Sequence, residues 1–177
     1  MKNLDPTGLK RLHRDWRRRT AQKITLILDS VQTPYNVGTI LRTSAALGVE
    51  HLWLVGATES PTHTKTNKTA MGTQRYLEWT HVEEPEQAVA EARAAGYRVV
   101  GIELADNASP LHELDLRGDL CLVVGHEDRG LSKAALAACD DVGYIPQVGK
   151  VGSLNVGVAA SIALAEARRQ GWAGSST

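Results

Sequence analysis

Short apolar runs alternate with amphipathic segments along most of this chain. The runs are rich in Val, Ile and Leu and are bounded by glycine or polar turn residues, a pattern typical of strands. Nearly every position in them is apolar, so we expect both faces of each strand to be buried, as in a parallel sheet. The predicted strands are Ile24–Leu28, His51–Val55, Arg98–Leu104, Leu120–Gly125 and Val142–Ile145, with a shorter one near Tyr76–Thr80.

Helix start and stop signals lie between these runs. Alternation of strands and helices predicts one α/β domain, a parallel sheet flanked by helices, which ordinary topology rules would leave unknotted. The last helix is rich in glycine and alanine, so it could pack closely against the sheet or against a second subunit. The predicted helices run from a cap at Asn36 to Leu47 with a stop at Gly48, from Pro85 to Ala95 before Gly96, from Ser132 to Ala138, and from Leu154 to Gln170 with Ser153 as cap.

Composition adds little to this picture. At 177 residues, the chain can bury a sizeable single core. The sequence contains no apolar stretch of bilayer length and no signal peptide, so we expect a cytoplasmic protein without a membrane partner. Cys121 and Cys139 lie in apolar surroundings without further ligands at metal-binding spacing. We therefore predict buried thiols and no metal site.

Charge is distributed unevenly, although the formal net charge is zero. Residues 1–23 hold eight bases and two acids, which leaves the rest of the chain with a net charge of −6. If residues 8–20 are helical, the cations form one stripe. This pattern predicts that residues 1–22 are a helical arm that binds a polyanion, and the alternative is a solvated helix without a partner. The arginines concerned are Arg11, Arg14, Arg17, Arg18 and Arg19.

Three polar segments that contain glycine directly follow predicted strands. In a parallel α/β sheet, the carboxyl ends of the strands form the binding crevice. We therefore expect the three segments to converge on one site. They are Asn36-Val37-Gly38 with Arg42, then Gly125–Ser132, and finally Ile145–Val156.

Each of the first two segments has two interpretations. Asn36 is either only a helix cap or part of the site, and Arg42 is either an exposed helix residue or a fork of donors for a phosphate or an alkoxide. Gly125 would let a ligand approach the backbone. Glu127 is either a solvated loop acid or a carboxylate that orients Arg42 or Arg129.

The third segment bends at Gly149 and Gly152 and then presents Ser153 and Asn155 at a helix start. Unpaired backbone donors at that position could hold adenosine or a carboxylate, and a purely structural loop with a helix cap is the competing interpretation. The sequence lacks the phosphate loop, the G-x-G-x-x-G fingerprint, the G-x-S-x-G elbow and the H-E-x-x-H pattern.

Taken in order, the three segments closely resemble the three motifs of SpoU-type RNA 2′-O-ribose methyltransferases, a branch of the SPOUT superfamily. Each motif alone is weakly specific, but the ordered triple is highly specific. The resemblance spans residues 24 to about 168. Its motifs correspond to residues 29–43, residues 124–132, and residues 145–147 with 153–156.

The resemblance implies a methyltransferase domain at residues 23–172 whose C-terminal part is tied in a deep trefoil knot, and we expect a disordered tail at residues 173–177. It also implies that S-adenosylmethionine lies in the knot loops, with the adenine clamped by apolar side chains and read by backbone groups. The implied cofactor-binding residues are Ile102, Glu103, Leu104, Gly125, Ile145, Gln147, Ser153 and Leu154.

The same resemblance implies that Arg42 is the catalytic residue and an RNA contact. Asn36, Glu127, Ser153 and Asn155 would then position Arg42 and the ribose. A guanidinium is effectively always protonated, so we interpret Arg42 as stabilising the forming alkoxide rather than as a base.

The chain departs from the common family pattern at Gln147, where methionine is frequent, and at Gly157, where serine is frequent. The family also implies a homodimer with RNA crossing both subunits. We expect tRNA rather than rRNA as the substrate, because the chain has a short basic extension and no separate RNA-binding domain. The alternative is a noncatalytic RNA-binding protein that retains the knot, although such a protein would have no reason to keep Arg42 and the complete third motif.

Overall fold

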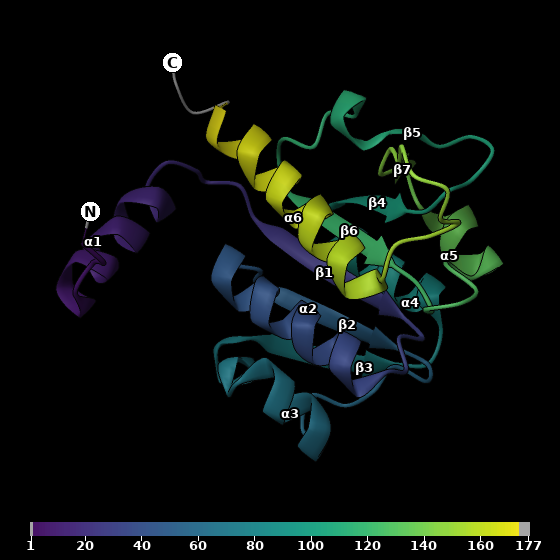
Figure 1. The fold of residues 1–177 in the computed structure, drawn as a ribbon. Coiled ribbons are helices and arrows are strands. Elements are labelled where there is room, and N and C mark those ends of the chain that lie inside the picture. Colours follow the sequence, from purple (N-terminus) through teal and green to yellow (C-terminus); the bar gives the residue numbers. More distant parts are fainter. Residues whose placement is uncertain (1, 174–177) are drawn as a thin grey trace.

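A computed structural model describes residues 2–173 of the chain. At its centre lies a seven-stranded sheet in which all strands are parallel, with the order β3-β2-β1-β6-β4-β7-β5 (Figure 1). The sequence pattern predicted a parallel sheet, and this prediction is confirmed. The strands are β1 (Ile24–Asp29), β2 (His51–Val55), β3 (Glu78–Val82), β4 (Arg98–Ile102), β5 (Ser109–Pro110), β6 (Leu120–Val124) and β7 (Asp141–Tyr144).

Helices cover both faces of the sheet (Figure 1). One face carries α2 (Pro34–Leu47), α3 (Thr64–Ala70) and α6 (Val156–Ala173), and the other carries α4 (Pro85–Ala94) and α5 (Lys133–Ala138). Two short 3-10 helices, η1 (Thr73–Tyr76) and η2 (Leu111–Glu113), complete the fold. The buried apolar residues form two clusters, one on each side of the sheet.

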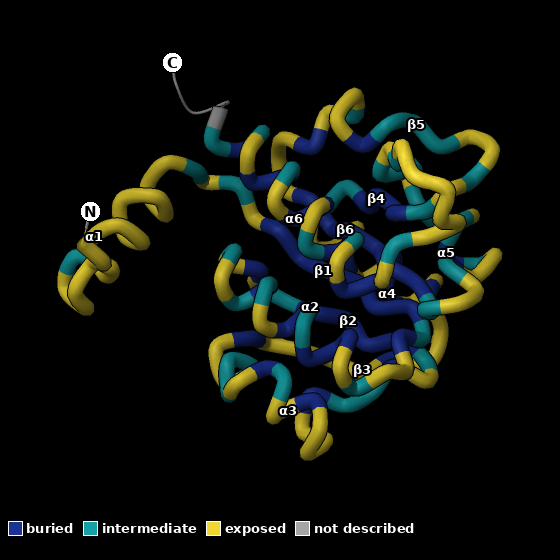
Figure 2. Tube along the Cα trace, viewed as in Figure 1, coloured by how far each residue is buried: buried dark blue, intermediate teal, exposed yellow. Residues whose placement is uncertain are grey.

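Strand β1 shows why its sequence is apolar at almost every position. Leu26 and Leu28 pack into the core beneath α2 and α6, whereas Ile27 packs into the core beneath α4 and α5. Because successive side chains point to opposite faces of a strand, a central strand needs apolar residues at odd and even positions alike. Figure 2 shows the central strands as buried along their length.

Several predicted boundaries need correction. Strand β4 ends at Ile102, two residues before the predicted end, and β3 lies two residues later than expected. Asn36 does not cap α2, which begins at Pro34 after an N-cap at Thr33. Ser153 does not cap the last helix, since α6 begins at Val156. The start of α5 after the Ser132 cap is confirmed.

Helix α3 was not anticipated from the sequence. Its seven residues, Thr64–Ala70, are mostly polar and include three β-branched threonines, and only Thr66 and Ala70 are buried. A helix this short shows no apolar periodicity, so tertiary contact rather than propensity decides its conformation. Gly38 of α2 permits that contact, because a Cβ there would lie 2.6 Å from the Cβ of Thr69.

The N-terminal arm contains α1 (Pro6–Arg17), which begins at the Asp5 cap and holds no buried residue. The helix stands out from the body (Figure 1) and is exposed along nearly all of its length (Figure 2). Trp16 contacts Trp172 near the end of α6, with ring centroids 4.7 Å apart. The predicted tail starts at Ala173, the last residue of α6, and its residues 174–177 lie outside the described part of the chain.

Both cysteines are free thiols. Burial raises the pKa of Cys121 to about 12 and that of Cys139 to about 11, so both remain protonated at neutral pH. Within residues 2–173, no helix has the length and apolar character needed to cross a bilayer.

A buried arginine joins α6 to the C-terminal end of α2. Arg168 of α6 is 6% exposed and donates hydrogen bonds to the carbonyl oxygens of Gln22, Leu47 and Gly48 at 2.7–2.8 Å. Burial lowers the pKa of Arg168. The last two carbonyls belong to the C-terminal end of α2, where a helix has unpaired acceptors and favours a cation.

We therefore expect Arg168→Leu to lower the free energy of unfolding by about 2–3 kcal/mol, because three buried acceptors lose a charged donor. Arg169→Leu is a matched control on the next residue, since Arg169 is exposed and forms its ion pair with Glu166 of the same helix. Its removal should change the free energy of unfolding little, because an exposed ion pair is screened by solvent. Urea unfolding of the three proteins measures both effects, and equal losses of stability in the two variants would contradict this assignment.

Candidate active site

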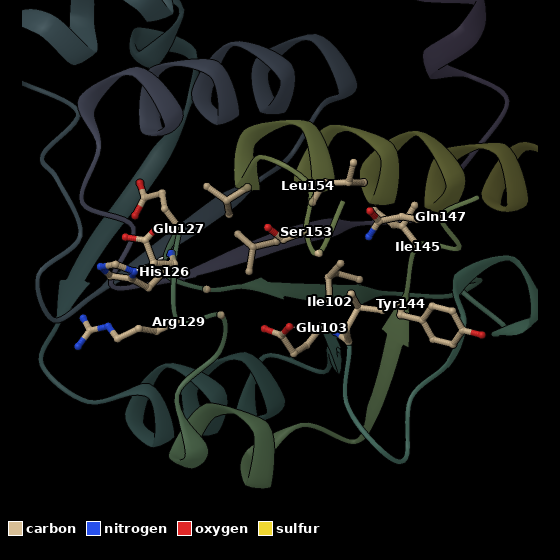
Figure 3. Close-up of a pocket in the computed structure, with 18 residues that line it drawn as sticks. Ile102, Glu103, His126, Glu127, Arg129, Tyr144, Ile145, Gln147, Ser153 and Leu154 are labelled. Carbon is tan, nitrogen blue, oxygen red and sulfur yellow. Dashed lines mark hydrogen bonds between the residues drawn. The ribbon is translucent and has the colours of Figure 1, made fainter. Parts of the chain in front are cut away.

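A cavity of about 480 Å³ opens at the carboxyl ends of β4, β6 and β7 (Figure 3). This volume is in the usual range for sites that bind small molecules. The residues after these three strands, together with the chain that leads into α6, form its walls. All eight residues predicted to bind the cofactor line it: Ile102, Glu103, Leu104, Gly125, Ile145, Gln147, Ser153 and Leu154.

The loop after β6 folds back tightly on one side of the cavity. The backbone groups of His126 and Gly130 exchange two hydrogen bonds of 2.9 Å, and Gly130 has a left-handed φ of 68°. A Cβ on Gly125 would lie 2.2 Å from the carbonyl carbon of Gly130. Gly125 is therefore required for the chain to turn back on itself, in addition to the predicted approach of a ligand.

Glu103 fixes the same loop from the end of β4. Its carboxylate accepts hydrogen bonds from the backbone N–H groups of Leu104 at 2.9 Å and Leu131 at 2.8 Å. Figure 3 shows this side chain beside Ile102 at the floor of the cavity. Glu103 thus has a structural role as well as a place in the cavity wall.

Gln147 contributes a polar atom without a partner. Its side-chain oxygen, Oε1, is buried and accepts no hydrogen bond within the described protein. Buried polar atoms are nearly always paired, so such an atom in a cavity wall marks a position where a donor is missing. A bound molecule with an N–H group would supply that donor.

A chain of three polar side chains joins the three sequence segments. Glu127 Oε1 accepts a hydrogen bond from Asn36 Nδ2 at 3.0 Å, and Asn36 Oδ1 accepts one from Asn155 Nδ2 at 2.8 Å. Asn155 Oδ1 in turn accepts from the backbone N–H groups of Gly157 at 2.9 Å and Val158 at 3.2 Å. Asn155, rather than Ser153, therefore satisfies the start of α6.

Glu127 remains negatively charged in this chain. Burial alone would raise its pKa, but hydrogen bonds from Asn36 and from the backbone N–H of Thr33 outweigh that effect and lower the pKa to about 2. A carboxylate with so low a pKa is a poor proton acceptor at neutral pH. Its chemistry here is to hold the segment before α2 in place.

Gly157 allows α6 to approach α2 closely. A Cβ at this position would lie 3.3 Å from the Cβ of Thr39 and 3.2 Å from Asn155 Oδ1. One turn later, the hydroxyls of Ser161 and Thr43 are 3.0 Å apart. The glycine and the small residues of α6 thus serve packing within one chain.

Arg42 lies apart from the cavity wall. Its side chain is exposed on α2, and Nη1 donates to the thioether sulfur of Met71 at 2.9 Å. It follows Asn36 by six positions, which places it about 9 Å further along the helix axis. Glu127 hydrogen-bonds to the segment 32–36, so the described structure does not bring Arg42 and Glu127 together as the sequence suggested.

The arginines of the arm are also remote from the cavity. Helix α1 lies beside the C-terminal end of α6, whereas the cavity meets the N-terminal end of that helix (Figure 1). The structure therefore separates the predicted site residues into a cavity, an adjoining polar chain, the exposed Arg42 and a distant cationic helix.

Sequence reasoning did not assign several residues that line the cavity. Tyr144 is the last residue of β7, so its place at a strand end was the available signal. His126, Asp128 and Arg129 belong to the second polar segment, and their position after a predicted strand was the signal for them too. The Nδ1 atom of His126 accepts a hydrogen bond from the backbone N–H of Asp128 at 3.0 Å, which leaves Nε2 as the protonated nitrogen of the neutral ring.

Comparison with known proteins gives consistent matches. The model of the SpoU rRNA Methylase family matches residues 23–165. The chain is 37% identical to the 23S rRNA (guanosine-2′-O-)-methyltransferase RlmB of Acinetobacter baylyi over 84% of this chain and 60% of that protein. It is 32% identical to the tRNA (guanosine(18)-2′-O)-methyltransferase of Escherichia coli over 94% of this chain and 72% of that protein.

Among solved structures, an AdoMet-bound rRNA methyltransferase from Sinorhizobium meliloti has a TM-score of 0.79 and 28% identity, and the match covers 93% of this chain and 70% of that one. The chain therefore spans only 60% of the length of the A. baylyi relative and a larger share of the others.

The polar chain predicts a pH-dependent effect of Glu127→Gln. The charge on Glu127 stabilises the fold above the ordinary glutamate pKa of about 4.5, and this contribution is lost as the pH falls towards about 2. At pH 7 the variant should lose about 1–2 kcal/mol of unfolding free energy.

At pH 3 the difference between the variant and the wild type should be smaller. Urea unfolding at the two pH values measures it. Glu113→Gln is the control, since that side chain is exposed, and it should change stability little at either pH. A difference for Glu127→Gln that stays constant between pH 7 and pH 3 would show that the carboxylate is not held in its charged form.

Proposed function

This chain belongs to the SpoU rRNA methylase family, and from that premise we propose that it transfers a methyl group from S-adenosylmethionine to a ribose 2′-hydroxyl of RNA. The observation that carries this proposal is that the second and third sequence segments line one cavity, while the first is hydrogen-bonded to both of them. Glu127, Asn36 and Asn155, one from each segment, are joined by side-chain hydrogen bonds beside the cavity.

The cavity suits S-adenosylmethionine in its chemistry. Ile102, Ile145 and Leu154 supply apolar surface for an adenine ring, and the unpaired oxygen of Gln147 is an acceptor for an exocyclic amine. The related S. meliloti structure is of an AdoMet-bound enzyme. Gln147 therefore fits the cavity although methionine is frequent at its position in the family.

When bound, S-adenosylmethionine supplies an electrophilic methyl group, so that attack by the ribose oxygen forms a C–O bond, breaks the sulfonium C–S bond and releases the hydroxyl proton to solvent. Arg42 would stabilise the negative charge that develops on this oxygen and hold the adjacent phosphate. Asn36 and Asn155 would fix the position of α2, on which Arg42 lies. Ser153, exposed at the cavity, would contact the ribose.

A noncatalytic RNA-binding protein is the less favoured alternative. The relatives compared above are named as methyltransferases, and six residues of the third segment line the cavity: Ile145, Gln147, Gly152, Ser153, Leu154 and Val156. A protein that only bound RNA would gain nothing from a cavity at the carboxyl ends of three buried strands.

We favour tRNA over rRNA as the substrate. The alignment with the E. coli tRNA enzyme covers 94% of this chain and so leaves about 11 of the 177 residues outside it, fewer than the 22 residues of the arm. The similarity to that enzyme therefore reaches into the arm. The sequence match to the A. baylyi rRNA enzyme covers 84% of the chain and does not require the arm, whereas the structural match to the S. meliloti rRNA enzyme covers 93% and also reaches into it.

We also propose the trefoil knot, a homodimer and a cytoplasmic location, where tRNA and rRNA are found. The path of residues 145–155 supports the knot. These residues leave β7, which lies beside β4 and one strand away from β6, and run past the strand ends to α6, on the face of the sheet opposite α5. Val158 and Ile162 are exposed one turn apart on α6 and provide apolar surface for a second copy.

The first test of this proposal is methyl transfer from labelled S-adenosylmethionine to bulk bacterial tRNA. Arg42→Ala should reduce turnover at least 100-fold, because the variant cannot stabilise the charge that develops in the transition state. Calorimetry should show one cofactor site per subunit with the same affinity in both proteins. Absence of cofactor binding at millimolar concentration would exclude a methyltransferase activity. Full activity of Arg42→Lys would show that the planar guanidinium of Arg42 is not needed.

The arm gives a second prediction. Arg11, Arg14 and Arg18 lie on one side of the exposed arm. Their joint replacement by glutamine should weaken tRNA binding and make it less dependent on salt. The slope of the logarithm of the binding constant against the logarithm of the salt concentration should fall by about 0.7–0.9 for each phosphate that the variant no longer neutralises. Trp16 and its contact with Trp172 are unchanged in this variant. Deletion of residues 1–20 should act in the same direction, with cofactor affinity unaltered. An unchanged salt slope would identify the arm as a solvated helix.

A further inference from the structure

The segment formed by α3 and η1 carries positive charge on a body that is negative on balance. Residues 60–77 contain Lys65, Lys68 and Arg75 but no aspartate or glutamate. All three cationic side chains are exposed. Figure 2 shows this segment at the edge of the molecule, with α2 between it and α6. A cationic surface of this kind favours a polyanion.

An exposed aromatic ring accompanies the cations. Tyr76 is 67% exposed, and the guanidinium of Arg75 lies 4.8 Å from its ring centroid. Arg75 Nη2 also donates a hydrogen bond to the Tyr76 hydroxyl at 2.9 Å. The pair is therefore held together with much of the ring open to solvent. Aromatic rings and guanidinium planes are the groups on which proteins stack unpaired bases.

The position of this surface is fixed relative to Arg42. Met71 and Gly72 adopt left-handed φ values of 54° and 75° at the turn from α3 into η1, and the sulfur of Met71 accepts the hydrogen bond from Arg42. Asn67 and Gln74 join the two short helices through a side-chain hydrogen bond of 2.6 Å. The close contact of Gly38 with Thr69 then holds α3 against α2.

We propose that the surface formed by Lys65, Lys68, Arg75 and Tyr76 binds single-stranded RNA next to the nucleotide whose ribose is methylated. The two lysines contact backbone phosphates, and the Tyr76 ring stacks on one unpaired base. This inference rests on the proposed function, which it deepens by naming a contact surface for the substrate. A duplex is a poor ligand for this surface, because its base faces are already stacked.

The experiment measures binding of a fluorescent 12-nucleotide oligo(U) strand to the full chain across a salt series. Tyr76→Leu should weaken binding roughly 5- to 150-fold without changing the salt slope, because stacking involves no counterion release. Tyr76→Phe keeps the ring and should bind close to wild type. Lys68→Ala should lower the slope by about 0.7, and Lys133→Ala, an exposed lysine on the opposite face, should leave it unchanged.

The same variants are then assayed for methyl transfer to bulk bacterial tRNA. Raised KM with unchanged cofactor affinity in Tyr76→Leu and Lys68→Ala supports the inference. If wild-type protein methylates RNA but both variants bind the oligonucleotide and methylate tRNA as well as the wild type does, the inference is wrong. A protein partner would then be the other candidate for this surface. If wild-type protein neither binds S-adenosylmethionine nor methylates RNA, the proposed function fails, and the oligonucleotide binding series still decides whether this surface holds RNA.

Discussion

The negative charge of Glu127 sets the direction of every hydrogen bond in the chain of polar residues at the site. A carboxylate can only accept hydrogen bonds, so Asn36 must turn its amide nitrogen towards Glu127 and its oxygen towards Asn155. Asn155 must then turn its own nitrogen to Asn36, which leaves its oxygen for the first N–H groups of α6. One ionised group thus fixes two side-chain amides and the start of a helix, although Asn36 is separated from its two partners by 91 and 119 residues of sequence.

The parts of the structure that the sequence predicts are those whose physical cause is local in the chain. Central strands such as β1 and β6 were predictable, because burial on both faces imposes apolar residues at consecutive positions. The residue pattern alone did not decide the function of Asn36, because asparagine at a helix start suits capping of the backbone as well as a place in the site. The hydrogen bonds of its side chain go to Glu127 and Asn155, which are distant in the sequence, and no local sequence pattern contains that information.

Other features escaped prediction for different physical reasons. Helix α3 exists because Gly38 lets it pack against α2, and the sequence Thr64–Ala70 alone would not favour it. The tight turn at Gly125 depends on Gly130 five residues later. The resemblance to a known family supplied the cavity residues as a set, but it could not show that Arg42 lies outside that cavity, on the side of α2 that faces Met71.

Helix α6 begins at the site, with Asn155, and ends beside the arm, where Trp172 contacts Trp16. Its 18 residues give it a length of about 27 Å. Within one chain, the cavity and α1 therefore lie at opposite ends of α6, and a ligand that contacts both must span most of the length of this helix. The length of α6 thus sets a lower limit on the size of such a ligand: a small molecule that fills the cavity cannot also contact the arm of the same chain, whereas an elongated polymer can.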